Sequence, residues 1–353
     1  MTKSWLKRVS ATDVVMWVVS LIIAGIVIYG SISSLQSGKY DGNTWKDLIV
    51  YGLTQGSIYA LIALGYTLVY GILRMINFAH SEIYMSGPFA SYFLASALLT
   101  SGFMDKQPWL SLILVALFAM FSSMVIAVSV ERIAYRPLRK APRLAPLITA
   151  IGASFFIQYV FKGLFGAGVK NYPELDVLKG QVNIFGLEMY RIHVIVLISA
   201  VGLMALLYTL VMKTKLGKAM RAVSEDKDSA ALMGINVDQI ISTTFAIGGV
   251  LAGAAGFLYA IMFRQVSWYM GFIPGLKAFT AAVLGGIGNI PGAMLGGLFL
   301  GLIESIGPTL FLAGLGIPAP NQLKDVIAFT LLVFILIFRP TGILGERLAT
   351  KKA

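Results

Sequence analysis

The sequence predicts an all-α protein that crosses a membrane many times. Its mean hydropathy is +0.82, and charged residues make up 12% of the 353 residues, about half of the roughly 25% found in soluble domains. Apolar runs of about 20 residues, the length that spans a bilayer as a helix, recur along the chain. The 37 glycines exceed the usual share of about 7% and suit closely packed transmembrane helices.

We predict eight to ten transmembrane helices and favour ten. One pair leaves the count open, because segment 274–288 is short and GGIGNIPG (285–292) separates it from segment 292–312. Unwound backbone occurs at membrane depth only where protein or water surrounds it, so the pair forms either two full helices or a re-entrant segment and one helix. The apolar segments lie near 14–35, 47–73, 78–100, 109–130, 145–168, 192–212, 240–263, 274–288, 292–312 and 322–338.

Glycines four residues apart recur in the apolar segments, for example at Gly52 and Gly56 and at Gly249 and Gly253. This spacing lets the backbones of two helices approach closely. It predicts close helix packing, with hinges between tilting helices as the alternative. The pattern is common among membrane proteins and names no function by itself.

Basic residues gather in a few loops and predict the side of the membrane that each loop faces, because positively charged loops stay in the cytoplasm. Ten helices with a cytoplasmic N-terminus place all base-rich regions inside, and both termini are then cytoplasmic. An eight-helix count agrees equally if 274–312 does not cross fully. The apolar run that starts at Val14 is longer than the apolar region of a signal peptide, which has roughly 7–15 residues. It predicts an uncleaved first helix, with a cleaved signal peptide as the alternative. The base-rich regions are 1–8, 131–143, 213–221 and 339–352.

Several classes of activity lack the residues they need. The chain has no cysteine and only two histidines, His80 and His193, which excludes thiolate sites and multi-histidine metal sites. It has no P-loop, no G-x-S-x-G and no H-E-x-x-H motif, so it is not by itself a Walker-type ATPase. The net charge of +12 reflects the topology, and we do not expect nucleic-acid binding. We predict a non-enzymatic chain that binds no metal or cofactor.

Ionisable and amide side chains inside apolar segments are costly there and commonly mark functional sites. The run MINFAHSEIYMSG (75–87) brings together Asn77, His80 and Glu82, which are candidates for a gate. The alternative is that they cap the start of a helix, with Asn77 as the N-cap. Glu304 lies midway along its segment and fits a buried helix contact better than a ligand. Further candidates of this kind are Gln55, Gln158 and Asn289.

The stretch GKAMRAVSEDKDSAALMGIN (217–236) is charged and lies between two apolar segments. It predicts a short amphipathic helix near 221–234, with Ser224 as its N-cap and Gly234 as a left-handed C-cap. A solvated cytoplasmic loop is the plain interpretation. The alternative is a slim helix that fits a groove on a partner, as a membrane subunit driven by a separate motor requires.

Several motifs in the same order resemble the permease of the high-affinity branched-chain amino acid transporter family, an ATP-binding-cassette (ABC) importer family, in the shorter of its two permease types. The stretch 217–236 resembles the coupling loop of such permeases. The resemblance covers about residues 45–346. The other motifs are GSIYALIALGYTLVYGILRMINFAHSEIYM (56–85), ERIAYRPLR (131–139), LITAIGASFF (147–156), KAFTAAVLGGIGNIPGAMLGG (277–297) and RPTGILGE (339–346).

The resemblance implies an importer in the bacterial inner membrane, built from two permeases, two ATPases and a periplasmic binding protein. The ATPases, and not this chain, would hydrolyse ATP. The family's substrates are leucine, isoleucine and valine, and related members move urea, amides or other amino acids. On this basis, docking to the ATPase is assigned to Arg221, Glu225, Asp226, Asp228 and Gly234.

The family also suggests how the chain is divided. We expect an N-terminal extension with the first helix at 1–45, a permease domain at 46–346 and a cytoplasmic tail at 347–353. The extension exceeds the family's usual short N-terminus. Ser81 also departs from the family, which has glycine there, and its side chain narrows a close backbone approach.

The translocation pathway is a separate hypothesis. Backbone groups at a Gly-rich break can guide a zwitterionic amino acid without fixed charges. The candidates are Asn77, His80, Glu82, Gly285, Gly286, Gly288 and Asn289. A stand-alone secondary transporter is the competing class, and it needs intramembrane carboxylates, to which only Glu82 and Glu304 come near. A membrane enzyme is the third class, for which no nucleophile is present.

Overall fold

The computed structural model describes residues 11–139, 141–142, 144–184, 187–339 and 341–345. The predicted basic start at residues 1–8 and the predicted tail at 347–353 lie outside the described residues. The helices are α1 Ala11–Gln36, α2 Gly42–Leu73, α3 His80–Thr100, α4 Phe103–Lys106, α5 Pro108–Val130, α6 Leu144–Phe165, α7 Arg191–Lys213, α8 Lys215–Glu225, α9 Lys227–Leu232, α10 Val237–Phe263, α11 Phe272–Gly285, α12 Ile290–Gly307 and α13 Lys324–Phe338.

Short irregular elements connect these helices. Two antiparallel pairs of strands form, β1 with β4 and β2 with β3. The strands are β1 Lys170–Asn171, β2 Gln181–Ile184, β3 Leu187–Tyr190 and β4 Gln265–Val266. The π-helical segments are η1 Glu131–Tyr135 and η4 Pro308–Leu312, and the 3-10 segments are η2 Arg136–Leu138, η3 Asp176–Leu178, η5 Ala313–Leu315 and η6 Pro320–Leu323.

Eight helical segments of the described chain are long and apolar enough to cross a membrane. The favoured count of ten is therefore not confirmed. Two of the ten predicted segments, which became α3 and α11, are not among the eight. With 14 residues, α11 is only about 21 Å long, which is less than the roughly 30 Å of a bilayer's hydrocarbon core.

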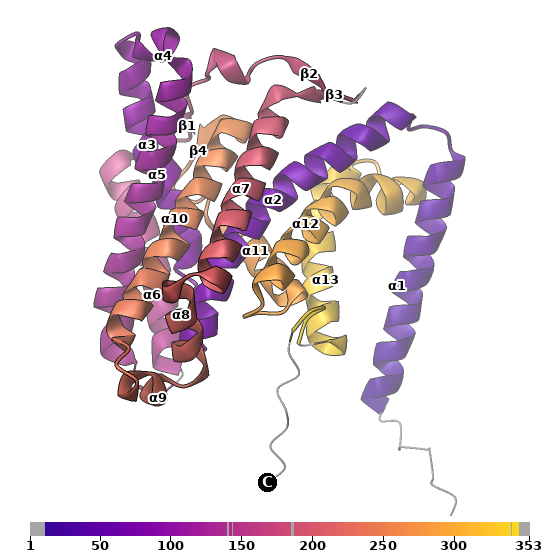
Figure 1. The fold of residues 1–353 in the computed structure, drawn as a ribbon. Helices are drawn as coiled ribbons and strands as arrows, with labels where there is room; N and C mark the ends of the chain where they lie inside the picture. The colour runs from indigo at the N-terminus through magenta and orange to yellow at the C-terminus, as the bar shows by residue number, and fades with distance from the viewer. Residues whose placement is uncertain (1–10, 140, 143, 185–186, 340, 346–353) are drawn as a thin grey trace, which may run out of the picture.

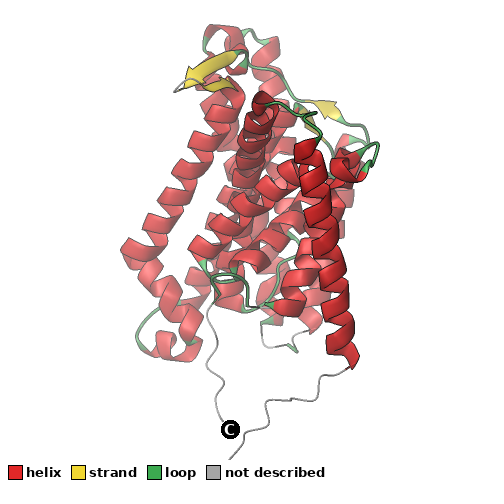
Figure 2. Cartoon of the chain, turned by 90° about the vertical axis from the view of Figure 1, so that its right-hand side faces the viewer, coloured by secondary structure: helices red, strands yellow, loops and turns green. Residues whose placement is uncertain are grey.

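The helices form one bundle whose two ends differ (Figure 1). The short helices α8 and α9 lie at one end, together with the first residues of α1. The strands and α4 lie at the opposite end, and Figure 2 shows the yellow strands gathered there. The charged stretch at 217–236 is thus separated from the strands by the length of the bundle.

The centre of the bundle is α2, whose residues from Thr54 to Val69 are all buried. Its glycines pack against α12: a Cβ atom added at Gly301 would lie 2.3 Å from the Cα of Gly56. Gly253 of α10 lies equally close to α5, since an added Cβ would lie 2.6 Å from the backbone oxygen of Ala119. The prediction of close helix packing from the glycine spacing is confirmed.

The first helix, α1, packs against η4 and α13. A Cβ atom added at Gly30 would lie 2.1 Å from the backbone oxygen of Phe311, and the Ser34 hydroxyl donates to the Thr309 carbonyl at 2.8 Å. Near its other end, the ring of Trp17 lies 6.3 Å from that of Phe338 in α13. The N-terminal helix therefore contacts the chain's last two long helical segments.

Both ends of α11 meet other parts of the chain. At its start, Gly275 leaves room for Ser81 of α3, because an added Cβ would lie 2.3 Å from the Ser81 Cβ. The Ser81 side chain, at a position where the family has glycine, thus fits because Gly275 opposite it has no side chain. At its other end, Ile343 and Leu344 donate backbone hydrogen bonds of 2.8 and 3.0 Å to the carbonyls of Leu284 and Gly285, which the helix itself leaves unpaired.

Candidate functional site

The predicted single helix at 221–234 is wrong in its boundaries, because the chain forms two helices that meet at Asp226. Ser224 is not an N-cap; its hydroxyl donates back to the Arg221 carbonyl at 2.7 Å. Asp226 caps α9 instead, accepting from the backbone N–H of Asp228 at 2.9 Å and from the Ser229 hydroxyl at 2.6 Å. These hydrogen bonds, the Ser229 hydroxyl first, lower the pKa of Asp226.

The end of α9 presents apolar side chains to solvent. Leu232 is 89% exposed and Met233 is 83% exposed. Gly234 follows with a φ of +84°, and the N–H of Ile235 bonds to the Ala230 carbonyl at 3.1 Å, so the predicted left-handed C-cap is confirmed. Sequence reasoning did not single out Leu232, although an apolar pair just before a glycine stop was visible in the sequence.

The predicted docking charges divide into two groups. Glu225 and Asp228 are exposed, and their carboxylates form no ion pair with the described residues. Arg221 instead donates to the Val211 carbonyl at 3.1 Å, which ties α8 to the end of α7. Arg74, at the end of α2, donates to the Ser224 carbonyl at 3.3 Å. The two arginines thus attach α8 to two long helices.

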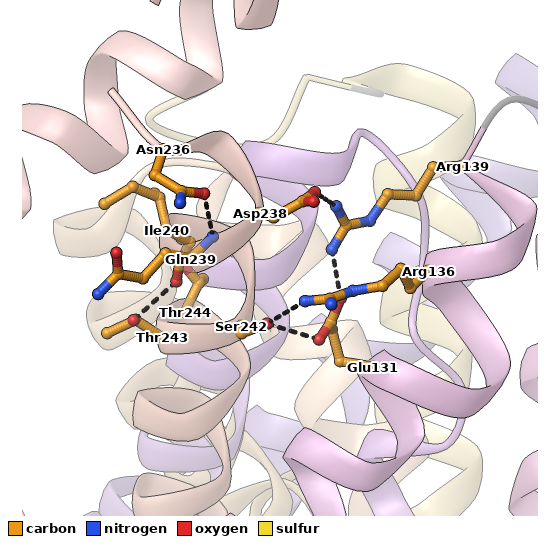
Figure 3. A network of polar contacts seen from close by, with 10 residues as sticks. All are labelled: Glu131, Arg136, Arg139, Asn236, Asp238, Gln239, Ile240, Ser242, Thr243 and Thr244. Carbon is orange, nitrogen blue, oxygen red and sulfur yellow. Dashed lines mark hydrogen bonds and ion pairs between the residues drawn. The ribbon is translucent and has the colours of Figure 1, made fainter. Parts of the chain in front are cut away.

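An ionic cluster around the buried Glu131 links the segment that follows α5 to the start of α10 (Figure 3). We call it the Glu131 cluster: Glu131, Arg136, Arg139, Asp238 and Ser242. The Glu131 side chain is fully buried and pairs with Arg136 at 3.4 Å and with Arg139. Arg139 also pairs with Asp238, and the Ser242 hydroxyl donates to Glu131 at 2.7 Å. Because α10 follows α9 after four residues, the cluster fixes the base from which α9 projects.

The start of α3 brings Asn77, His80 and Glu82 into the core, where each is almost fully buried. Asn77 does not cap α3, since no side chain caps this helix and the Asn77 oxygen accepts from the Tyr135 hydroxyl at 2.8 Å. His80 packs on Gly65 and edge-on to Tyr66, with 4.8 Å between the ring centres. That Asn77, His80 and Glu82 line the translocation pathway stays a prediction.

The glycine-rich break between α11 and α12 is tightly packed. Gly286 has a φ of +105°, and an added Cβ would lie 2.4 Å from the backbone nitrogen of Gly345. Asn289 caps α12, accepting from the Gly292 N–H at 2.9 Å, and its amide donates to the Leu344 carbonyl at 2.9 Å. Gly288, in contrast, has nothing within 4 Å of an added Cβ. That the backbone groups of residues 285–289 are exposed along the translocation pathway also stays a prediction.

Sequence reasoning named Glu304 but missed its partner, Lys277. The two side chains form a buried ion pair at 2.6 Å between α11 and α12, so the interpretation of Glu304 as a buried, paired helix contact is confirmed. A single lysine inside the apolar segment 274–288 was the available signal. Such a residue is rare enough in a membrane segment to indicate a specific partner.

The family described as "Branched-chain amino acid transport system / permease component" matches residues 48–336. The chain belongs to this family. The permease BraD of Pseudomonas aeruginosa, of a high-affinity branched-chain amino acid transport system, is 44% identical over 301 residues, which cover 84% of this chain and 95% of BraD. The corresponding LivH of Escherichia coli is 41% identical over 298 residues, covering 84% and 94%.

The chain thus matches BraD and LivH over nearly their whole length. Among solved structures, an inward-facing ABC transporter of the metal-chelate type aligns over 91% of this chain and 99% of that chain, with a TM-score of 0.44 and 15% identity. Family membership and the eight apolar helices make the chain a multi-pass inner-membrane protein.

Proposed function

We propose that this permease is a transmembrane subunit of an ATP-driven importer that moves branched-chain amino acids across the bacterial inner membrane. Its relatives BraD and LivH carry that substrate class in their names. The chain would work with a second permease subunit, two ABC ATPases and a periplasmic binding protein. ATP would be bound and hydrolysed by the ATPases, with no cofactor held by this chain and no role for nucleic acid.

The observation that carries the proposal is the construction of α8 and α9. An exposed apolar tip, Leu232 and Met233, projects from a base that Arg74, Arg221 and the Glu131 cluster tie to α2, α7, α5 and α10. An exposed apolar pair of this kind gains stability when a partner protein covers it. A force applied to α9 by an ATPase would thus reach four long helices, and this is the arrangement that alternating access requires.

The same construction orients the chain in the membrane. If α8 and α9 meet a cytoplasmic ATPase, the end of the bundle that carries them is cytoplasmic. The base-rich segment 131–139 shares this end, as the contact of Arg139 with Asp238 requires. The strands at the opposite end would then face the binding protein. Both termini are proposed to be cytoplasmic.

Uptake by the complete importer in liposomes tests the proposal. We expect uptake of leucine, isoleucine and valine that requires ATP, the binding protein and this chain. Uptake by the purified chain alone without ATP would instead support a stand-alone transporter. Uptake of urea or an amide in place of these amino acids would reassign the substrate.

The docking role of α9 has its own test, for which Leu232→Ala is the sharpest variant. Leu232 is 89% exposed, so its truncation costs the isolated chain little, whereas burial of a leucine against a partner contributes about 1.5–3 kcal/mol. We expect co-purification with the ATPases to weaken at least tenfold, and Leu206→Ala, on the exposed surface of α7, to have no effect. Unchanged ATPase binding by Leu232→Ala would contradict the docking role. Asp226→Lys is a poor test, because it also removes the cap of α9.

A further inference from the structure

A groove opens on the bundle surface between the segment that follows α5 and the first turns of α10. Because α10 follows α9 after four residues, the groove lies at the end of the bundle that carries α8 and α9. Its volume of about 500 Å³ leaves room for a ligand. Each wall contributes side chains spaced by about one helical turn. We call it the Arg132 groove: Val128, Arg132, Arg136, Gln239, Thr243 and Ala246.

Both arginines of the groove have N–H groups to donate. Arg132 is exposed and forms no hydrogen bond or ion pair with the described residues. Arg136 donates from its Nε to Glu131 at 3.4 Å and from its Nη2 to the Ser242 hydroxyl at 2.9 Å (Figure 3), and its Nη1 has no partner among those residues. Because a guanidinium presents a planar fork of donors that matches an oxyanion, the two side chains can together hold one phosphate group.

The groove and its surroundings carry a surplus of positive charge. Asp238 also lines the groove, but its carboxylate pairs with Arg139. The buried Glu131 pairs with Arg136 and Arg139. Three arginines thus stand against two carboxylates, which leaves one positive charge, and Arg132 is the arginine without a partner in the described part of the chain. A ligand with one negative charge would complete the balance.

The position of the groove in the membrane favours a lipid over a soluble anion. With 27 residues, α10 is about 40 Å long, which exceeds the roughly 30 Å of a bilayer's hydrocarbon core. Its first turns are polar, with Gln239 and Thr243 in the groove wall, and so suit the headgroup region. Val128 and Ala246 lie deeper along the two helices and are apolar. A basic mouth above an apolar floor matches a phospholipid, which joins a phosphate to acyl chains.

We propose that the Arg132 groove binds an anionic phospholipid of the adjacent leaflet. The phosphodiester accepts hydrogen bonds from Arg132 and from Nη1 of Arg136, and its single negative charge equals the surplus of the site. The hydroxyls of a glycerol headgroup meet the exposed amide of Gln239, and an acyl chain begins on Val128 and Ala246. The site does not depend on which solute the importer moves, and it adds a lipid ligand beside the base of α9.

Lipid binding to the purified full-length chain in a neutral detergent tests the site. Native mass spectrometry counts the bound lipids and gives the Kd of the first one. The probes are dioleoylphosphatidylglycerol and dioleoylphosphatidylcholine, which share acyl chains and phosphate but differ in net charge. We expect phosphatidylglycerol to bind at least about tenfold more tightly, because each of two basic residues near an anionic lipid contributes several-fold. Equal affinity for the two lipids would overturn the proposal.

Arg132→Gln is the variant that affects the ligand alone, because the Arg132 side chain has no partner among the described residues that its removal would disturb. It should weaken phosphatidylglycerol binding about fivefold and leave phosphatidylcholine binding unchanged. Lys213→Gln, at an exposed base outside the groove at the same end of the bundle, is the matched control and should bind as the unaltered chain does. Normal phosphatidylglycerol binding by Arg132→Gln would rule the site out.

The apolar floor has its own variant. Ala246→Phe fills the floor without changing a charge and should weaken phosphatidylglycerol binding several-fold, because an acyl chain can no longer lie there. Ala205→Phe, on the exposed surface of α7, is the control and should have no effect. Equal lipid binding by these two variants would contradict the seat of the acyl chain.

Two further measurements separate the lipid from other anions. Glycerophosphoglycerol, the headgroup without acyl chains, and inorganic phosphate should each bind at least about tenfold more weakly than the lipid, because they cannot cover the apolar floor. Binding as tight as that of the lipid would make the groove a site for soluble anions and overturn the lipid assignment. Unchanged lipid binding by Arg132→Gln together with weaker co-purification of the ATPases would instead assign Arg132 to a protein interface.

Discussion

Replacing Glu131 with glutamine is expected to loosen the joint between α5 and α10. The Glu131 carboxylate is fully buried, and three donors, from Arg136, Arg139 and Ser242, converge on it. Hydrogen bonds to a charged group contribute about 1.5–3 kcal/mol. The side chains of Arg136 and Arg139 are 41% and 15% exposed, and Arg139 keeps Asp238 as a partner, which places the expected loss near the lower limit, about 1.5 kcal/mol, or a factor of about 10 in the unfolding equilibrium.

The measurement is reversible unfolding of the purified chain in mixed micelles, followed by circular dichroism. Arg132→Gln is the matched control, because Arg132 is exposed and forms no ion pair with the described residues; we expect a change within about 0.5 kcal/mol. The double variant Glu131→Gln with Arg139→Gln should be less destabilised than the sum of the single variants, by about 1 kcal/mol or more. A loss under about 0.5 kcal/mol for Glu131→Gln, or strict additivity, would refute this account.

Two further predictions concern the cap of α9 and the glycine contact of α2. The lowered pKa of Asp226 means that its cap contributes fully above the ordinary value of 3.8 and is lost as the pH falls below it through the lowered pKa. Hydrogen exchange of the Ser229 backbone N–H should therefore accelerate in this acidic range. Asp226→Asn, which keeps a capping oxygen, should remove this dependence of the exchange on pH. Gly301→Ala places a Cβ 2.3 Å from Gly56 and should cost about 1–3 kcal/mol by overpacking, while Gly202→Ala, in open space, should not destabilise the chain. Equal unfolding of the two alanine variants would count against the close contact.

The long helices were predictable because their signal is local. The apolar segments near 109–130 and 192–212 became α5, Pro108–Val130, and α7, Arg191–Lys213, within one residue at each end. Membrane-crossing length and the absence of charge decide such elements without knowledge of their neighbours. The glycine spacing also predicted that helices pack closely at Gly56 and Gly253. It did not predict that the partner helices are α12 and α5.

The break at Asp226 and the pairing of Lys277 were not predictable in the same way. Ser224, Glu225 and Asp226 are all acceptable near the first turn of a helix, and only the packing of α8 on α7 through Arg221 places the break after Glu225. Lys277 and Glu304 are 27 residues apart, on helices separated by a glycine break. Their contact depends on the angle between α11 and α12, which the sequence pattern does not encode.

The glycine break also decides how the pathway hypothesis is best tested. A bulky residue at Gly286 would strike the backbone of Gly345, 2.4 Å away, so such a variant reports on packing. Gly288 has a φ of +98° but open space around an added Cβ, so a side chain there meets backbone strain but no neighbouring atom. If Gly288 borders the pathway, Gly288→Asn should reduce leucine uptake by the complete importer several-fold at unchanged assembly. Gly38→Asn is the matched control, with a φ of +61° and equally open space, and it should leave uptake unchanged. Normal uptake by Gly288→Asn would remove this residue from the pathway and leave the break a packing element.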